Sequence, residues 1–254
     1  MSTTTRRSWL RHRLAACAAA CLGAAAAAQT APQEPVRVNV DESNPPFMFA
    51  REGRARGVYP ALMTAAFQEM HVELRIEPKP WRRALQELDA AQAGVGGIYK
   101  NSERLAKYDF SDAMYVERIN VYVPAARYFS YTRLADLEGK RVGVIRGWSY
   151  GDDFDRARSS GHLLAEDVES DEQNFRKLAF GRLDALLAID EAGAVRLKQH
   201  ADIRLAGTMV ENPTFLAFHK SAHQAALLER FNAALAKLKK SGRLDSIVDH
   251  AMAR

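Results

Sequence analysis

Apolar runs of strand length alternate with longer helical patterns along residues 36–252, and this alternation constrains the fold more than any other feature. It predicts strands at residues 36–40, 72–77, 95–98, 119–124, 141–145, 183–189, 203–206 and 215–218. It predicts helices at residues 58–70, 80–89, 172–180, 222–239 and 243–252. Such a chain folds as an α/β protein. Ligands are then expected at the carboxyl ends of parallel strands, in the turns that lead into helices.

Residues 1–28 differ from everything that follows. Arg6 and Arg7 begin a basic stretch without acidic residues, and an almost unbroken apolar run covers residues 14–28. The run is shorter than the ~20 residues that span a membrane, and its final alanines suit signal peptidase. We therefore expect a signal peptide that is cleaved after Ala28. The arginine pair resembles a twin-arginine signal, although general secretory signals are arginine-rich too.

Removal of this leader changes both the charge and the cysteine content. Four of the 36 basic residues leave with it, so 32 remain against 31 acidic residues. A nearly neutral net charge implies no basic surface, so a nucleic-acid or anionic-membrane partner loses its main support. Cys17 and Cys21 both lie in the leader. The rest of the chain therefore has no disulfide and no thiolate, which suits an oxidising compartment.

Short motifs follow one another along residues 44–247. They are Asn44-Pro45-Pro46-Phe47, a helix opened by Gly57, Pro80-Trp81-Arg82-Arg83-Ala84-Leu85, Ser102-Glu103-Arg104, Asp109-Phe110-Ser111, Leu137-Glu138-Gly139-Lys140-Arg141-Val142-Gly143-Val144, Gly181-Arg182-Leu183-Asp184-Ala185 and Gly242-Arg243-Leu244-Asp245-Ser246-Ile247. In this order and spacing they resemble the bacterial extracellular solute-binding proteins of family 3, the polar amino-acid binders of ABC transporters.

The resemblance implies the two-lobed α/β fold of type II periplasmic binding proteins, with a ligand cleft between the lobes and two hinge strands. Residues 29–122 and 215–254 then form lobe 1, and residues 123–214 form lobe 2. The expected protein is a periplasmic monomer that captures a small carboxylate-bearing, amino-acid-like solute by hinge closure and delivers it to an ABC transporter permease. No cofactor or metal is expected, because His219 and His223 straddle a strand end despite their i, i+4 spacing.

The resemblance places Arg104 at the position of the arginine that binds the ligand's α-carboxylate. A guanidinium suits this task because its planar fork donates two parallel hydrogen bonds to one carboxylate. Asn101 or Ser102 is expected to cap the short helix that carries it. The alternative interpretation is a solvated arginine on a helix surface.

The turn of residues 147–151 reads Gly-Trp-Ser-Tyr-Gly, a literal G-x-S-x-G between a strand and a helix. In the family, such a turn binds an anion through its backbone N–H groups and the Ser149 hydroxyl. In an α/β-hydrolase, Ser149 is a nucleophile. The triad partners that the chain order then permits are Asp184, Asp190, His219 and His223. We favour the anion site, because a hydrolase needs more strands before this turn and an HGGG-like motif.

The family's ammonium ligand stands five residues after the position of Asp184, where this chain has Ile189. Asp190 and Glu191 stand one and two residues after that position. A slip of one residue in a strand turns a side chain to the opposite face. Asp190 binds the ligand's ammonium if the strand end is shifted or bulged, and otherwise it caps a helix.

Residues 97–100 read Gly-Ile-Tyr-Lys where the family has small hydroxyl residues, and Tyr99 and Lys100 are expected to line the pocket. An aromatic clamp that stacks on the ligand and adds a cation–π contact is expected from Phe47, Trp81, Tyr99, Tyr115 and Trp148. The other interpretation of these aromatic residues, above all of Phe47 and Tyr115, is core packing.

Two further functions suit the same fold. A periplasmic enzyme similar to cyclohexadienyl dehydratases would use Asp190 or Glu191 as a general acid whose pKa burial raises. Product formation from prephenate or arogenate distinguishes that enzyme from a binder. A sensor subunit would pass its closed state to a membrane receptor, and genomic neighbours distinguish sensing from transport.

Overall fold

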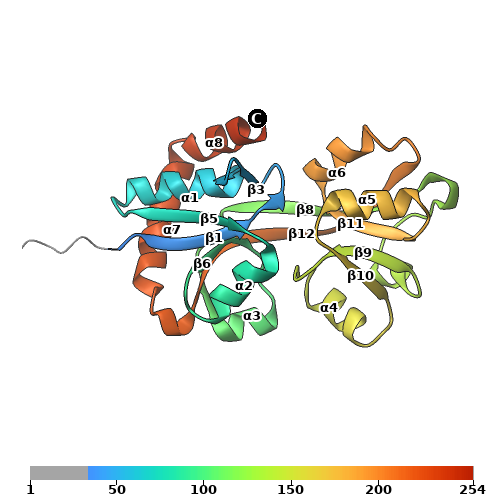
Figure 1. Cartoon of the computed structure of the whole chain (residues 1–254), viewed down its shortest axis with the longest axis horizontal. Coiled ribbons are helices and arrows are strands. Elements are labelled where there is room, and N and C mark those ends of the chain that lie inside the picture. The colour runs from blue at the N-terminus through green and yellow to red at the C-terminus, as the bar shows by residue number, and fades with distance from the viewer. Residues whose placement is uncertain (1–33, 254) are drawn as a thin grey trace, which may run out of the picture. The chain divides into compact units, whose positions relative to one another are not determined.

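Three parallel strands form the sheet of the first lobe in a computed structural model that describes residues 34–253 (Figure 1). They are β1 (Val36–Asp41), β5 (Leu74–Lys79) and β6 (Gly94–Ile98). β1 lies between the other two. Helices α1 (Val58–Glu69) and α2 (Trp81–Asp89) connect them. The predicted leader at residues 1–28 lies outside the described residues.

The second lobe repeats this pattern. Its parallel strands are β9 (Arg141–Ile145), β10 (Leu164–Val168) and β11 (Ala185–Ile189), with β9 in the middle. The helices α4 (Asp152–Ser159), α5 (Asp171–Ala179) and α6 (Asp190–Leu197) follow these strands in turn. Each helix therefore begins near the carboxyl end of a strand. The predicted α/β class is confirmed.

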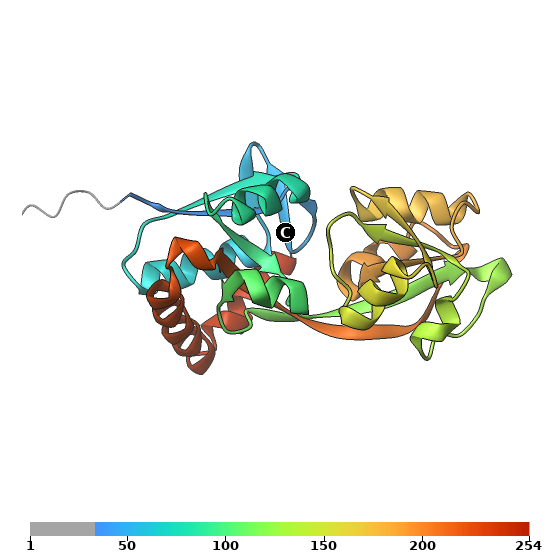
Figure 2. The ribbon, with the colours of Figure 1, turned by 90° about the horizontal axis from the view of Figure 1, so that it is seen from below.

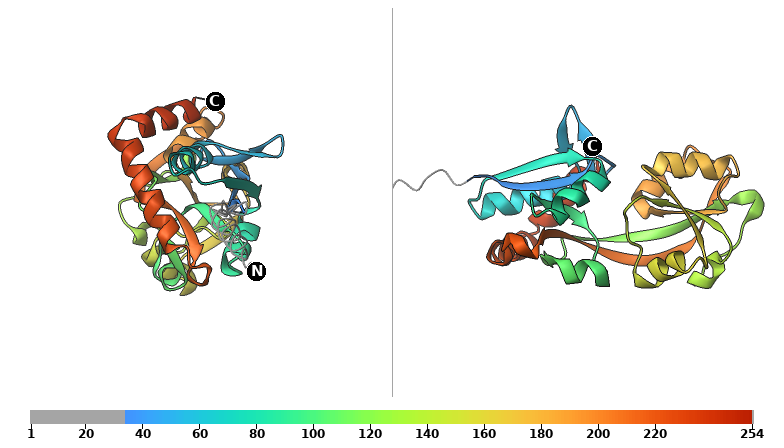
Figure 3. Two further views of the ribbon diagram at one scale, coloured as in Figure 1. Left: turned by 90° about the vertical axis from the view of Figure 1, so that its left-hand side faces the viewer. Right: turned by 60° about the horizontal axis from the view of Figure 1, so that its bottom comes forward.

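Two long antiparallel strands join the two sheets, β8 (Tyr115–Pro124) and β12 (Ile203–His219). β12 pairs with β8 up to Thr214 and with β6 from Phe215 onward, while β8 also pairs with β11. Figures 2 and 3 show the green and orange strands running between the lobes. The prediction of separate strands at 203–206 and 215–218 is wrong, because one strand covers both. Register shifts near Gly207 and Met209 interrupt its period of two residues.

The remaining elements lie mostly on lobe 1. A small antiparallel sheet consists of β2 (Ser43–Asn44), β3 (Met48–Arg51) and β4 (Arg54–Arg56). α3 (Ser102–Lys107) leads into β7 (Tyr108–Phe110), which pairs with β12. The chain ends in α7 (Ala225–Lys240) and α8 (Arg243–Met252), which both pack on α1. The 3-10 turns are Ala125–Arg127, Leu134–Leu137 and Lys220–Ala222.

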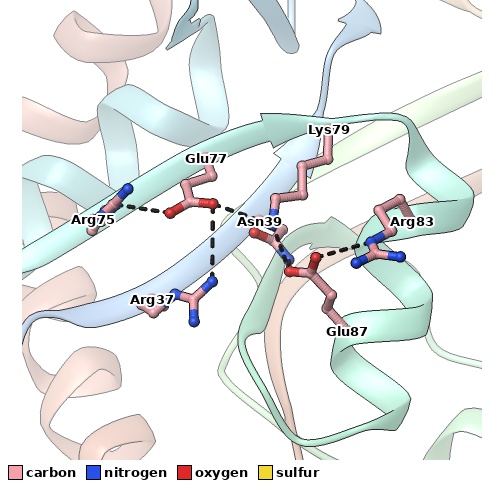
Figure 4. Close-up of polar contacts among 7 residues, drawn as sticks. All are labelled: Arg37, Asn39, Arg75, Glu77, Lys79, Arg83 and Glu87. Atoms are coloured by element: carbon pink, nitrogen blue, oxygen red, sulfur yellow. Dashed lines mark hydrogen bonds and ion pairs between the residues drawn. The ribbon is translucent and has the colours of Figure 1, made fainter.

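Polar side chains hold α2 against β1 and β5 (Figure 4). The buried carboxylate of Glu87 accepts hydrogen bonds from Lys79 (2.6 Å), Asn39 (2.9 Å) and Arg83 (3.1 Å). The hydrogen bond from Lys79, helped by those from Asn39 and Arg83, lowers the pKa of Glu87 to about 2. Glu87 therefore remains ionised at neutral pH, and it holds in place the helix that begins at Trp81.

Candidate ligand-binding site

Arg104 lies in α3, and the predicted cap of this helix is confirmed: the Asn101 side chain accepts a hydrogen bond from the Arg104 backbone N–H (2.8 Å). The Arg104 guanidinium donates to the carbonyl of Tyr99 in its own lobe (2.8 Å) and to the carbonyl of Gly147 in lobe 2 (2.8 Å). Burial lowers the pKa of Arg104, yet a guanidinium remains charged in proteins. Arg104 thus bridges the lobes with a fork that fits two oxygen acceptors.

The turn of residues 147–151 joins β9 to α4 and meets lobe 1 through several hydrogen bonds. The indole N–H of Trp81 donates to the carbonyl of Gly147 (3.2 Å). The Asn101 amide donates to the Ser149 hydroxyl (3.1 Å), and Ser102 donates twice to Asp152, from its N–H (3.1 Å) and its hydroxyl (2.6 Å). The structure therefore brings Trp81, Arg104 and the turn together at one contact between the lobes.

Ser149 is almost fully buried, and its hydroxyl donates to the carboxylate of Asp155 in α4 (2.6 Å). The histidine and acid of the hydrolase interpretation are engaged elsewhere. His219 is hydrogen-bonded to Ser221 (2.7 Å), and Asp184 pairs with Arg141 (3.3 Å). This arrangement does not form the triad of a nucleophilic serine, and the anion-binding interpretation of the turn stays a prediction.

Trp148 packs edge-on against Tyr99, with 5.7 Å between ring centroids and 87° between ring planes. Both side chains are buried. The indole N–H of Trp148 has no hydrogen-bond partner in the described part of the chain. A buried donor without an acceptor is unfavourable, so this N–H is suited to a ligand oxygen.

Phe47 and Lys100 make their contacts elsewhere. Phe47 is fully buried, stacks on Tyr59 (5.7 Å between centroids) and contacts Tyr115 (5.7 Å). The Lys100 ammonium lies 3.8 Å from the ring centroid of Phe215 in β12, and burial lowers its pKa. Neither side chain is hydrogen-bonded to Arg104 or to the turn in the described structure, and their predicted ligand contacts stay predictions.

Glu117 of β8 is a buried acid that sequence reasoning missed. It is 1% exposed and accepts hydrogen bonds from the hydroxyls of Tyr59 and Tyr99. Gly97 makes room for this arrangement: its φ is +79°, and a Cβ there would lie 2.6 Å from the Tyr59 ring. Burial raises the pKa of Glu117 well above its usual range. The signal available in the sequence was a lone acid within an apolar strand.

Asp190 is the first residue of α6, because β11 ends at Ile189. Its carboxylate accepts a hydrogen bond from Asn120 (2.8 Å) and lies 3.9 Å from Arg118. Both partners belong to β8. The next residue, Glu191, accepts a hydrogen bond from the Tyr115 hydroxyl (2.9 Å). The predicted ammonium contact of Asp190 stays a prediction.

A pocket of about 850 Å³ lies between the lobes. Lobe 1 contributes residues from 42–50 and the end of α8, and lobe 2 contributes the start of α5 and one face of α6. Of the residues that the sequence singled out, Tyr115 and Glu191 line it. Asp171 of α5 also lines it, and sequence reasoning missed this acid because it follows a helix cap and resembles an ordinary first-turn residue.

Comparison with known proteins identifies the family. A sequence profile of the bacterial extracellular solute-binding proteins, family 3, matches residues 36–253. The chain belongs to this family. The L-cystine-binding protein TcyJ of Escherichia coli (strain K12) is 27% identical over 216 residues, 83% of this chain and 79% of the relative. The arginine-binding periplasmic protein of Mannheimia haemolytica is 24% identical over 231 residues, 84% and 89% of the two chains.

A solved structure supports the same assignment. An ancestral arginine-binding protein bound to arginine superposes with a TM-score of 0.73 at 25% identity, covering 86% of this chain and 98% of that chain. The predicted two-lobed fold is therefore confirmed, and this family 3 protein has a solute-binding role. Between residues 34 and 253 the structure contains no helix that is both long and apolar enough to cross a membrane.

Proposed function

We propose that this family 3 protein captures a small carboxylate-bearing, amino-acid-like solute between its lobes and delivers it to an ABC transporter. The observation that carries the proposal is the Arg104 fork, which already spans the lobes through two carbonyl acceptors. A ligand carboxylate offers the same fork two oxygens of higher charge. The names of the two relatives, which specify L-cystine and arginine, support an amino-acid-like ligand.

Closure follows from the same contacts. Arg104 holds the carboxylate from lobe 1, while Ser149, Trp148 and the turn of residues 147–151 close on it from lobe 2. Trp81 and Tyr99 flank the site. A ligand that contacts both lobes binds the closed state better than the open state, so it shifts the population toward closure. The closed state is the form that we expect the transporter permease to accept.

Arg104→Ala tests the carboxylate site. Because the variant loses the fork, we expect its affinity for the best-binding L-amino acid to fall by about 100-fold in isothermal titration calorimetry. Arg82→Ala is the matched control, since Arg82 is an exposed arginine in α2. Unchanged affinity in the Arg104 variant, or binding of amines without carboxylates, would contradict the proposal.

We further propose that the protein works in the periplasm as a monomer after cleavage of the leader, and that it does not transform its ligand. N-terminal sequencing of the exported protein tests cleavage after Ala28, and light scattering tests the monomer. Incubation with prephenate or arogenate is expected to leave both compounds intact. Product formation that Glu191→Gln abolishes would establish the enzyme instead.

A further inference from the structure

The pocket between the lobes carries an excess of negative charge. Its acidic lining residues are Glu42, Asp171, Glu172, Glu191 and Asp249. Arg196 is the one basic residue among the described lining residues, and it pairs with Glu172 (3.6 Å). The other four carboxylates form no ion pair within residues 34–253. Such a concentration of unpaired charge between two closing surfaces is unfavourable unless a cation joins it.

Asp171 and Glu191 are the two acids of this lining with buried, unsatisfied oxygens. Asp171 Oδ1 and Glu191 Oε2 are inaccessible to solvent and have no hydrogen-bond donor among the described residues. The other oxygen of Glu191 accepts the Tyr115 hydroxyl (2.9 Å). Burial raises the pKa of Asp171 to about 7, an effect that Arg196 opposes and Asp41 increases. A buried carboxylate without a partner is costly, so these oxygens are suited to a cationic donor.

A second cavity, of about 10 Å³, adjoins the pocket and shares Ser43, Ser170 and Asp171 with it. Asn44 from lobe 1 and Trp148 from lobe 2 also line this cavity. Asn44 is 4% exposed, and neither its amide nitrogen nor its amide oxygen has a partner within the described chain. The indole nitrogen of Trp148 likewise has no hydrogen-bond partner among the described residues. Both lobes therefore present unsatisfied polar atoms beside Asp171, as expected of a ligand site.

Helix capping alone does not explain the two acids. Asp171 and Glu191 lie in the first turns of α5 and α6, where a negative charge stabilises the helix dipole. Their sequence neighbours occupy the same turns and have partners within the protein: Glu172 pairs with Arg196, and Asp190 is bonded to Asn120. The side chains of these neighbours are 61% and 44% exposed. In each turn, one acid is thus satisfied by the protein, and the other lines the pocket with a buried oxygen that has no donor among the described residues.

We propose that the solute carries a cationic side chain, an ammonium or a guanidinium, which binds Asp171 and Glu191 and determines specificity for positively charged amino acids. This inference rests on the proposed function and names its substrate class. The α-ammonium of an amino acid is balanced by its own α-carboxylate, so a neutral amino acid brings no net charge to four unpaired carboxylates. A side-chain cation supplies that charge.

Arginine and citrulline form the matched pair of probes, because they have the same length and differ in the charge of the terminal group. At pH 8, calorimetry with the purified protein is expected to give an affinity about 100-fold higher for L-arginine than for L-citrulline. In Asp171→Asn and in Glu191→Gln this ratio is expected to fall to about tenfold or less. In the control variants Glu172→Gln and Asp190→Asn the ratio is expected to remain.

The ratio is measured within each variant, so partial unfolding lowers both affinities together and leaves the ratio unchanged. Citrulline binding as tightly as arginine to the unmodified protein overturns the inference while the proposed function stands. A ratio that survives in the double variant of Asp171 and Glu191 also overturns it. Loss of the ratio in Asp190→Asn alone overturns the assignment to Glu191. Failure of every L-amino acid to bind overturns both the inference and the proposed function.

Discussion

Glu87 and Asp171 are buried carboxyl groups with opposite electrostatic surroundings. In lobe 1, Glu87 accepts hydrogen bonds from Lys79, Asn39 and Arg83, and its pKa falls to about 2. At the cleft, the Oδ1 atom of Asp171 has no donor in the described structure, and burial raises its pKa to about 7. Burial is common to both residues. The presence of a cationic partner makes the difference.

The difference indicates what each region is for. The network around Glu87 is complete within the protein, so it supports α2 whether or not a ligand is bound (Figure 4). The carboxylates at the cleft lack a cationic partner until another molecule brings a positive charge. A fold that leaves buried charge unneutralised at an opening between lobes therefore indicates where ligand specificity lies.

Removal of the charge from Glu87 is expected to have the largest effect on stability. Glu87→Gln removes the buried carboxylate that Lys79, Asn39 and Arg83 share and leaves Lys79 paired with the more exposed Glu77, and we expect the free energy of unfolding to fall by about 3 kcal/mol at pH 7. Scanning calorimetry should show a melting temperature lower by about 9 °C. The arginine-to-citrulline ratio should not change, because Glu87 does not line the pocket between the lobes.

The pH dependence of the Glu87 effect has a definite sign. Its folded pKa lies below the unfolded value, so its contribution is present above about pH 4 and is lost as the pH falls through about 2. Glu77→Gln is the control, since Glu77 pairs with Arg75 (2.8 Å) and Lys79 (3.2 Å) in a more exposed place and should cost about 1 kcal/mol. Equal losses of unfolding free energy in Glu87→Gln and Glu77→Gln would contradict the larger contribution that we assign to Glu87.

Asp171→Asn is expected to act in the opposite direction. The folded pKa of about 7 lies above the unfolded value, so Asp171 makes the ligand-free protein less stable as the pH rises from about 4 to 7. The titratable groups that face it are Arg196 of α6, Asp41 of β1 and Glu117 of β8. The variant should therefore be more stable than the unmodified protein at pH 8, by about 1–2 kcal/mol. Thermal melts at pH 4 and pH 8 measure this, and a less stable variant at pH 8 would exclude an unneutralised Asp171.

Most of the fold was predictable because the hydrophobic period follows the elements closely. β1, β9, α1 and α8 begin at the residues that the pattern indicates. β12 was not predictable as one strand, because register shifts disturb its period of two residues. Gly207 lies in this irregular stretch, where a Cβ would come within 2.4 Å of the Tyr131 carbonyl. The close approach of a distant segment cannot be deduced from local pattern.

The candidate site was predictable only where a motif marks it. Arg104 and Ser149 were found from motifs, and the structure places both at the contact between the lobes. Asp171 and Glu117 depend on tertiary contacts, because what distinguishes them is burial without a cationic partner, whereas the sequence had already singled out Glu191 as a candidate general acid. The sequence shows acids after a helix cap or within a strand, which is also the pattern of ordinary stabilising residues.

Glu117→Gln is expected to have the smallest effect on stability. It tests whether Glu117 resembles Glu87, a carboxylate that the protein stabilises, or Asp171, a carboxyl group whose pKa burial raises. Burial raises its pKa well above the usual range and so favours the protonated form, for which glutamine is a close substitute. The glutamine oxygen can accept from one of the Tyr59 and Tyr99 hydroxyls, and its amide NH2 can donate to the other hydroxyl oxygen, as the O–H of a protonated acid does. We expect a change below about 1 kcal/mol in urea unfolding, against about 3 kcal/mol for Glu117→Ala, which removes both contacts and leaves a cavity. A loss of several kcal/mol in Glu117→Gln would mean that Glu117 is ionised. It would then resemble Glu87 as a carboxylate satisfied by the protein.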